Sequence, residues 1–217
     1  MSMFSRISEN DLVRIRETVK RAENQISGEI MPVLVRQSHH YPAVKWKSGS
    51  LLALVAFVAI VVIDRWFPQI AVYDPLYYFL IVSCSGILGA MLPLWFPSLK
   101  RFLVTEAEQK HAARQKAETV FLEEEVFNTA HRTGIMIFVS FLEHEVIVMA
   151  DSGISSKVNQ KEWDSITNNL IDHIKAERLI DGIEEAVTQC GQLLLEKGFS
   201  KKADDKNELS DHLRIDP

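Results

Sequence analysis

Cysteine is scarce in this chain, and its scarcity excludes two classes of protein. Only Cys84 and Cys190 occur, and neither belongs to a metal-binding spacing, so a disulfide framework and a zinc cluster are both excluded. We do not expect the two to pair, since Cys84 lies inside an apolar run. We interpret Cys190 as a small buried apolar residue rather than a reactive thiol.

The chain also lacks the concentrated basic face of a nucleic-acid-binding protein. Its formal net charge is −5 over 217 residues, so nucleic acid is excluded as the main partner. The sequence contains no DxDx phosphatase motif, no Cys-x5-Arg loop and no HExxH. No simple catalytic motif therefore identifies a reaction, and the catalytic residues are unknown at this stage.

Charge is missing from two stretches in the middle of the chain. Residues 51–63 and 76–96 contain no charged side chain. Trp46 and Trp66 bracket the first stretch, and Trp95 lies near the end of the second, where aromatic side chains anchor membrane helices. A bilayer-spanning helix needs about 20 residues, so both stretches are long enough to cross once their flanks are counted.

We therefore predict a transmembrane hairpin over residues 46–97, with spans at about 48–66 and 75–96. A signal peptide would begin near Met1, and a soluble core helix would carry a polar stripe, which neither stretch has. In the second span, small residues recur at four-residue spacing and could form the face that meets the first span; they are Ser85, Gly86, Gly89 and Ala90.

The basic residues around the hairpin predict its orientation. They gather before the first span and after the second; examples are Lys45, Lys47, Lys100 and Arg101. The connection between the spans has only Arg65, beside an aspartate. Basic residues are retained in the cytoplasm, so we expect an inner-membrane protein with both termini cytoplasmic.

The remaining sequence predicts alternating helices and strands. A capping box at Ser8 starts a helix that ends near Gly28. A strand follows over 29–36, in which Pro32 indicates an edge position or a locally unpaired site. The later elements are a long helix over 102–129, an antiparallel strand pair over 135–141 and 146–150 buried on both faces, and helices that begin with capping boxes at Asn159 and Asp181.

This order predicts an α/β fold, a three-layer α/β/α sandwich interrupted by the two-helix hairpin. Residues 1–45 form the first part of the domain and residues 98–199 the remainder. Residues 200–217 have little apolar content and are expected to be a mobile tail.

Four parts of the sequence carry a family resemblance. SGEIMPVLVR (27–36), HRTGIMIFVSFLEHEVIVMADSGISSKV (131–158), Trp163 and DGIEEAVTQCGQLL (181–194) resemble the TPM domain in order and spacing. The resemblance covers roughly residues 5–199 apart from the hairpin. The family includes thylakoid-lumen and photosystem repair proteins, an auxiliary protein of acetylcholine receptors and many bacterial membrane proteins. It implies an α/β/α sandwich and the label phosphatase.

The resemblance also implies a candidate site. Relatives have a Gly-Tyr-Gly-Leu-like turn after the second hairpin strand and can bind a divalent cation nearby; here the turn is Asp151-Ser152-Gly153-Ile154. Asp151 is thus a candidate ligand for Ca²⁺ or Mg²⁺. Ligands in open α/β sheets gather at strand ends. The alternative is an Asx-turn, in which the Asp151 carboxylate accepts backbone N–H groups around Gly153.

Further residues could join this site. Arg132, with His131, could hold a phosphate or carboxylate, or could merely stabilise a helix C-terminus. The glutamates beside strand ends could contribute oxygen ligands; they are Glu29, Glu143 and Glu145. The predicted ligand-binding residues are therefore Arg132, Asp151 and Gly153.

Three functions remain open from sequence. The first is a membrane-anchored auxiliary module that contacts another membrane protein and aids its assembly, maintenance or regulation. The second is a divalent-metal-dependent phosphatase that uses Asp151. The third is self-association through the small-residue face of the spans. In every case the lipid bilayer is a partner.

Overall fold

The computed structural model describes residues 7–69, 74–201, 208–210 and 212–216. The chain divides into two compact units. One unit comprises Met1–Ser38 and His111–Pro217, and the other, His39–Lys110, is inserted within it. An insertion was predicted from the sequence, although the predicted limits, 46 and 97, fall inside the inserted unit.

The first unit alternates helices and strands along the chain. Its elements are α1 (Glu9–Glu23), β1 (Glu29–Val35), β2 (Gly134–Ser140), β3 (Glu145–Ala150), α6 (Ser152–Ser155), α7 (Gln160–Lys175), α8 (Leu179–Glu196) and β4 (Arg214–Asp216). Helix α5 (Glu106–Glu123) begins in the inserted unit and continues into this one. The capping boxes that the sequence predicts at Ser8 and Asn159 are both present.

The four strands form one sheet in the order β3-β2-β1-β4. β1 pairs in parallel with β2 over its whole length, from Glu29 opposite Gly134 to Val35 opposite Ser140. β4 also runs parallel to β1, and β3 is antiparallel to β2. The carboxyl ends of β1, β2 and β4 therefore lie at the same end of the sheet, here called the carboxyl edge. β3 runs the other way and ends at the opposite end.

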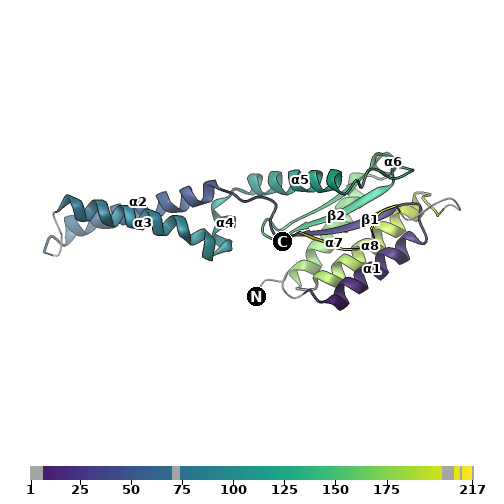
Figure 1. Ribbon diagram of the computed structural model, residues 1–217, viewed down its shortest axis with the longest axis horizontal. Helices are drawn as coiled ribbons and strands as arrows, with labels where there is room; N and C mark the ends of the chain where they lie inside the picture. Colours follow the sequence, from purple (N-terminus) through teal and green to yellow (C-terminus); the bar gives the residue numbers. More distant parts are fainter. Residues whose placement is uncertain (1–6, 70–73, 202–207, 211, 217) are drawn as a thin grey trace. The chain divides into compact units, whose positions relative to one another are not determined.

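Helices cover both faces of the sheet, which confirms the three-layer α/β/α prediction (Figure 1). Alternate strand residues such as Ile30 and Ile137 pack with α1, α7 and α8. The residues between them, such as Val33 and Phe138, pack with Ala117 and Val120 of α5. Because successive side chains of a strand point to opposite faces, these two clusters are the two halves of the core. Three helices thus lie on one face and α5 on the other.

The predicted helix over 102–129 is wrong, because it is two helices. Helix α4 (Pro97–Leu103) ends at Val104, whose backbone is extended. Thr105 then begins α5 with a capping box: its backbone N–H donates to Glu108, and its hydroxyl oxygen accepts from the Glu108 N–H at 3.3 Å. The Thr-x-x-Glu pattern that marks this start is present in the sequence.

Two strand predictions need correction. β1 lies inside the sheet rather than at its edge. β4 pairs only with Val33–Val35. Pro32 lies just before these residues and has no partner on the β4 side, so the alternative prediction of a locally unpaired site holds. Strand β2 is fully buried as predicted, but β3 is only partly buried because it is the edge strand.

Two predictions near the C-terminus are also wrong. Helix α8 begins at Leu179 instead of at a cap on Asp181, whose carboxylate instead lies 3.0 Å from the guanidinium of Arg14. The expected tail includes a strand, since Arg214–Asp216 forms β4 and extends the sheet. The residues 202–207, 211 and 217 of that tail lie outside the described part of the chain.

The inserted unit holds two long apolar helices, α2 (Ala43–Trp66) and α3 (Pro75–Trp95). Small residues allow the two helices to approach closely. A Cβ on Gly49 would lie 2.9 Å from the Gly86 carbonyl oxygen, and a Cβ on Gly89 would lie 2.8 Å from the Ser48 carbonyl oxygen. The predicted packing face of the second span is thus confirmed at Gly86 and Gly89.

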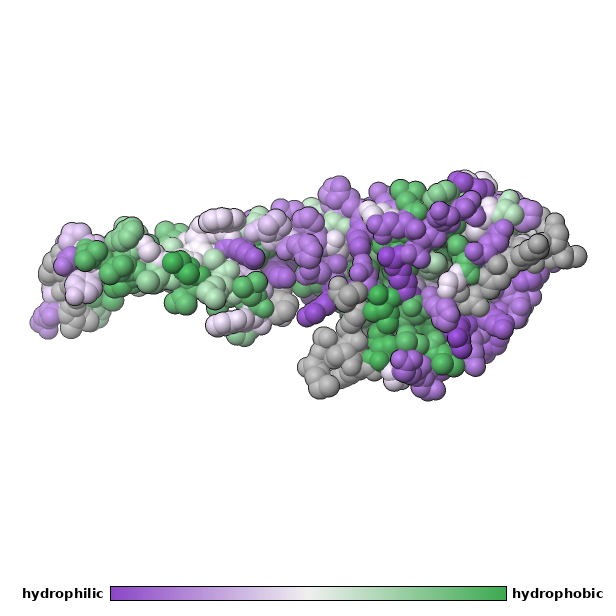
Figure 2. Space-filling view, viewed as in Figure 1, coloured by the Kyte–Doolittle hydropathy of each residue, from purple (hydrophilic) through white to green (hydrophobic). Residues whose placement is uncertain are grey.

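Most other side chains of the two helices are exposed, as the hydrophobic surface along them in Figure 2 shows. Phe57 is 54% exposed and Leu88 60%. A soluble core helix would bury such residues. Both helices are long and apolar enough to cross a membrane.

Cys190 lies in α8 and is fully buried. Burial raises the pKa of its thiol to about 12. The thiol is therefore neutral at physiological pH and behaves as a core residue, in agreement with the sequence interpretation.

Gly134 provides a test of how tightly β2 packs at its start. A Cβ there would lie 1.9 Å from the Val126 carbonyl oxygen, a backbone atom that cannot easily move, so we expect Gly134→Ala to lower the free energy of unfolding by about 3 kcal/mol. Gly198→Ala is the control. Gly198 has a positive φ of 84° and no atom near the position of an added Cβ, so this variant should lower the free energy of unfolding by about 1 kcal/mol. Urea unfolding of both variants measures the difference, and equal costs would contradict the packing argument.

Candidate functional site

Asp151 directly follows β3 and caps the short helix α6. Its own N–H donates to the Gly134 carbonyl oxygen at 2.9 Å, which fixes its backbone to the start of β2. Its carboxylate oxygen Oδ1 accepts the Ser152 N–H at 2.6 Å. Because the side chain is only 5% exposed, these contacts hold a carboxylate almost out of water.

Arg132 supplies the positive charge for this carboxylate. Its Nε lies 2.8 Å from Oδ2 of Asp151. The N–H is not directed at this oxygen, so the contact is an ion pair rather than a hydrogen bond. The guanidinium carbon Cζ also lies 5.6 Å from the centre of the Phe127 ring, and the side chain is 53% exposed. The cation thus remains accessible to solvent.

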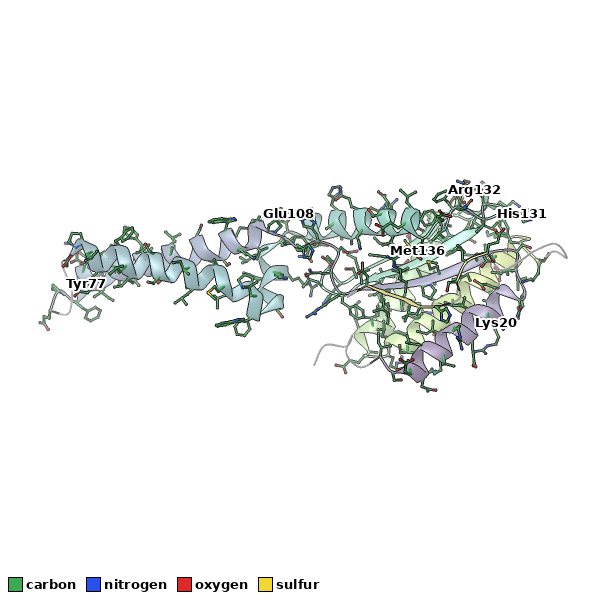
Figure 3. The ribbon with its side chains drawn as sticks, viewed as in Figure 1. Lys20, Tyr77, Glu108, His131, Arg132 and Met136 are labelled. Carbon is green, nitrogen blue, oxygen red and sulfur yellow. The ribbon has the colours of Figure 1, made fainter. Side chains whose placement is uncertain are left out.

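Gly153 brings the turn against the loop before β2. Its N–H donates to the Arg132 carbonyl oxygen at 3.0 Å. A Cβ on Gly153 would lie 2.6 Å from the carbonyl oxygens of both His131 and Arg132, so any larger residue would push the two segments apart. Figure 3 shows His131 and Arg132 in this loop. The structure therefore brings the three predicted ligand-binding residues together.

The Asp151 carboxylate caps its own turn through the Ser152 N–H. It does not accept the Gly153 N–H as the Asx-turn alternative predicts, because that N–H donates to the Arg132 carbonyl oxygen. The described residues contain no group of three His, Cys, Asp or Glu side chains that could hold a metal ion. Glu145 begins β3, six residues before Asp151, and so lies about 20 Å away along an extended strand. Glu29 accepts the backbone N–H groups of Glu208 and Leu209. Among the described residues, Glu29 and Glu145 thus do not complete a group of three such side chains at Asp151, and the divalent cation stays a prediction.

The expectation that ligands gather at this strand end also needs correction. That rule concerns the carboxyl edge of parallel strands. Because β3 is antiparallel to β2, Asp151 lies at the edge where β1 and β2 begin. What this edge offers chemically is one half-exposed guanidinium beside a buried carboxylate, which could contact a single anionic group.

The carboxyl edge carries a polar cluster around Glu143, which the sequence offered as an oxygen ligand for the Asp151 site but which lies at the opposite end of β3. Glu143, only 3% exposed, lies in the turn between β2 and β3. Both its carboxylate oxygens accept the Ser38 N–H at 3.1 Å. The Ser140 hydroxyl donates to the same carboxylate, and the Ser38 hydroxyl donates to the Ser140 oxygen at 2.8 Å. Glu143 thus holds the residue at which the chain leaves the first unit.

Comparison with known families supports the fold and the resemblance. Residues 100–193 match the family model of the TPM domain. The chain contains a TPM domain. The match covers α5, the β2–β3 hairpin, α7 and most of α8, whereas α1 and β1 lie before it.

Among solved structures, the TPM-containing chain is similar to the NMR structure of BA42 protein from the psychrophilic bacterium Bizionia argentinensis. The TM-score is 0.58 and the identity 16%, with 97% of this chain and 95% of that chain covered. At this identity the likeness concerns the fold alone. The comparison with curated proteins gave no match.

No local motif could have identified the Glu143 cluster. Ser38 and Glu143 are 105 positions apart and meet only because β1 and β2 run side by side in the TPM domain. A buried glutamate near a turn looks in sequence like any solvated glutamate. The one available signal was the serine that ends the otherwise apolar β2.

Glu143→Gln tests whether this carboxylate holds the start of the connection. The amide keeps the shape but offers one acceptor oxygen instead of two, so we expect the unfolding free energy to fall by about 1–3 kcal/mol. Hydrogen exchange at the Ser38 N–H should become faster. Asp172→Asn on the exposed face of α7 is the control and should stay within about 0.5 kcal/mol. Unchanged Ser38 exchange in Glu143→Gln would contradict this role.

Proposed function

We propose that this protein is a membrane-anchored TPM domain that faces the cytoplasm and assists the assembly, maintenance or regulation of a membrane protein complex. The observation that carries the proposal is the apolar exposed surface that runs along α2 and α3. Water disfavours such a surface at about 25 cal/mol per Å², whereas lipid accepts it.

The charges that flank the two helices support the orientation. Lys45 and Lys47 lie in the first turns of α2, and Lys100 and Arg101 lie in α4, directly after α3. The connection between α2 and α3 carries Arg65 beside Asp64. The positive-inside rule then puts both ends of the hairpin, and with them the TPM domain, in the cytoplasm of a bacterial inner membrane.

The way the hairpin joins the domain supports an interaction role. The chain leaves the TPM domain after Ser38 and returns through α5, so two covalent connections tie the domain to the spans. The small residues of α3 already contact α2 within the chain. Self-association through that same face would have to displace this packing, which favours a different chain as partner.

Fractionation followed by crosslinking in native membranes tests this function. The full-length protein should sediment with membranes and crosslink to a different membrane protein. The double variant Val58→Arg with Leu88→Arg places charges on exposed middle positions of both spans, each costing about 2.5–3.5 kcal/mol, and should lose both properties.

Val13→Arg on the exposed face of α1 is the matched control and should keep both properties. Recovery of the wild-type protein in the soluble fraction, or of self-crosslinks alone, would overturn the proposal.

A phosphoester assay addresses the alternative of a metal-dependent phosphatase. Because Asp151 is already held by Arg132 and the Ser152 N–H, we expect no turnover of p-nitrophenyl phosphate by the full-length protein, with Ca²⁺, with Mg²⁺ or with neither. Turnover that Asp151→Asn abolishes and Asp164→Asn retains would favour the enzyme instead. Asp164 is an exposed carboxylate and serves as the control.

A further inference from the structure

An open edge of the sheet lies along β3, and most of the backbone polar groups that point outward from this strand have no partner in the described part of the chain. Antiparallel partners alternate between pairs that exchange hydrogen bonds and pairs that do not. Asp151 and Gly134 form a hydrogen-bonded pair, because the Asp151 N–H donates to the Gly134 carbonyl oxygen. Counting back along β3 from this pair, the N–H and C=O groups of Val146, Val148 and Ala150 point away from β2. The Ser155 hydroxyl donates to the Ala150 oxygen at 2.8 Å, as expected for an outward carbonyl. Within the described ranges, no hydrogen bond reaches the other outward groups.

A groove of about 490 Å³ runs along this edge. β3 lines its length from Val146 to Ala150, Arg114 of α5 lies on one side, and Asp164 and Thr167 of α7 lie on the other. Val158 and Trp163 also border the groove on the α7 side, but both are buried. The two helices thus leave room beside the edge strand.

Edge strands of soluble proteins are normally protected by charge, proline or a bulge. Here Val146–Ala150 contains neither a charged residue nor a proline, and its pairing with β2 has no register shift. The side chains of Val148 and Ala150 are only partly buried although they pack against the core. The edge is therefore suited to accept another strand.

We propose that this groove binds an extended peptide segment of a partner protein, which joins the sheet as an additional strand beside β3. This inference deepens the proposed function, on which it rests, by naming the contact surface. Backbone hydrogen bonds to Val146, Val148 and the Ala150 N–H supply the attachment, and alternate side chains of the added strand supply specificity.

The groove also indicates the chemistry of the segment. Side chains on the α7 side meet Val148 and Ala150, which are only partly buried, and this favours apolar residues there. Those on the α5 side meet Arg114, whose Nε lies 2.7 Å from Glu118. No other described carboxylate is within ion-pair distance of this guanidinium, so an acidic side chain complements it. The expected segment alternates apolar and acidic residues and lacks proline.

A second copy of this chain fits the edge less well. Two copies related by a two-fold axis would pair β3 with β3 in antiparallel fashion. In each copy the connections to the hairpin leave at the carboxyl edge of β1, since Ser38 follows β1 and Lys116 of α5 lies 2.8 Å from Asp216 at the end of β4. Antiparallel pairing would send these connections out at opposite ends, whereas both hairpins must enter one bilayer.

The test uses the full-length protein in nanodiscs and a defined peptide, acetyl-Thr-Val-Glu-Val-Glu-Val-Thr-amide. With the peptide at about ten times its Kd, linkage predicts that the exposed amides of β3 exchange hydrogen about tenfold more slowly. The amides of α1 should not change. A peptide whose central valine is replaced by proline should have no effect.

Val148→Pro should abolish this protection, because it removes an outward N–H that β2 does not use. Val148→Ala loses a similar amount of packing but keeps the N–H, and should retain protection. Arg114→Glu provides a variant that leaves β3 untouched, and it should reverse the preference toward a peptide with lysine in place of glutamate.

Three results would overturn the inference: equal protection in Val148→Pro and Val148→Ala, no response to any peptide, or protection that rises with protein concentration alone and so identifies a second copy. A heterologous crosslink in membranes that survives Val148→Pro would reject the groove while leaving the proposed function intact. Peptide-dependent protection without any membrane partner would reject the proposed function while leaving the groove intact.

Discussion

The parallel pairing of β1 with β2 is the constraint on which the rest of the structure depends. These strands lie on opposite sides of the inserted hairpin in sequence, yet they match residue for residue from Glu29 to Val35. Their side chains form the centre of both halves of the core. Parallel strands need a long crossover, and here that crossover contains the two apolar helices as well as α5.

This pairing also places different polar side chains at the two ends of the strands. At one edge β1 and β2 begin, and the Asp151 turn, the Arg132 loop and Gly153 meet there. At the other edge Glu143 accepts the Ser38 N–H, close to where the chain continues toward the hairpin. The polar side chains at the first edge form an ion pair that can meet one anionic group, and those at the second hold a covalent connection.

Much of the fold could be predicted from the residues, for reasons that are local. The capping boxes at Ser8 and Asn159 mark helix starts through side chains that satisfy nearby backbone N–H groups. The uncharged stretches around Phe57 and Leu88 identify the hairpin helices by length alone. The three-layer order followed from a strand that is apolar on both faces, as β2 is. The break at Thr105 was equally local and was overlooked because the surrounding residues are strong helix formers.

The predictions that failed concern contacts between distant residues. Pro32 favours an edge by its missing donor, but β4 pairs only beyond it, so β1 can lie inside the sheet. The polar C-terminal segment lacks a core of its own and forms a strand only because β1 presents an unpaired edge to it. For the candidate site, the structure brings Arg132, Asp151 and Gly153 together, and ligand binding by them stays a prediction. Their arrangement as an ion pair in a capped turn was not predicted.

The sequence by itself determined the elements and the apolar hairpin, because hydrophobic periodicity and capping act over a few residues. The tertiary structure alone decided which edge each polar side chain occupies, that Glu143 meets Ser38, and that β3 is left open beside a groove. Those outcomes depend on strand order and direction, which arise when segments far apart in the chain pair with one another.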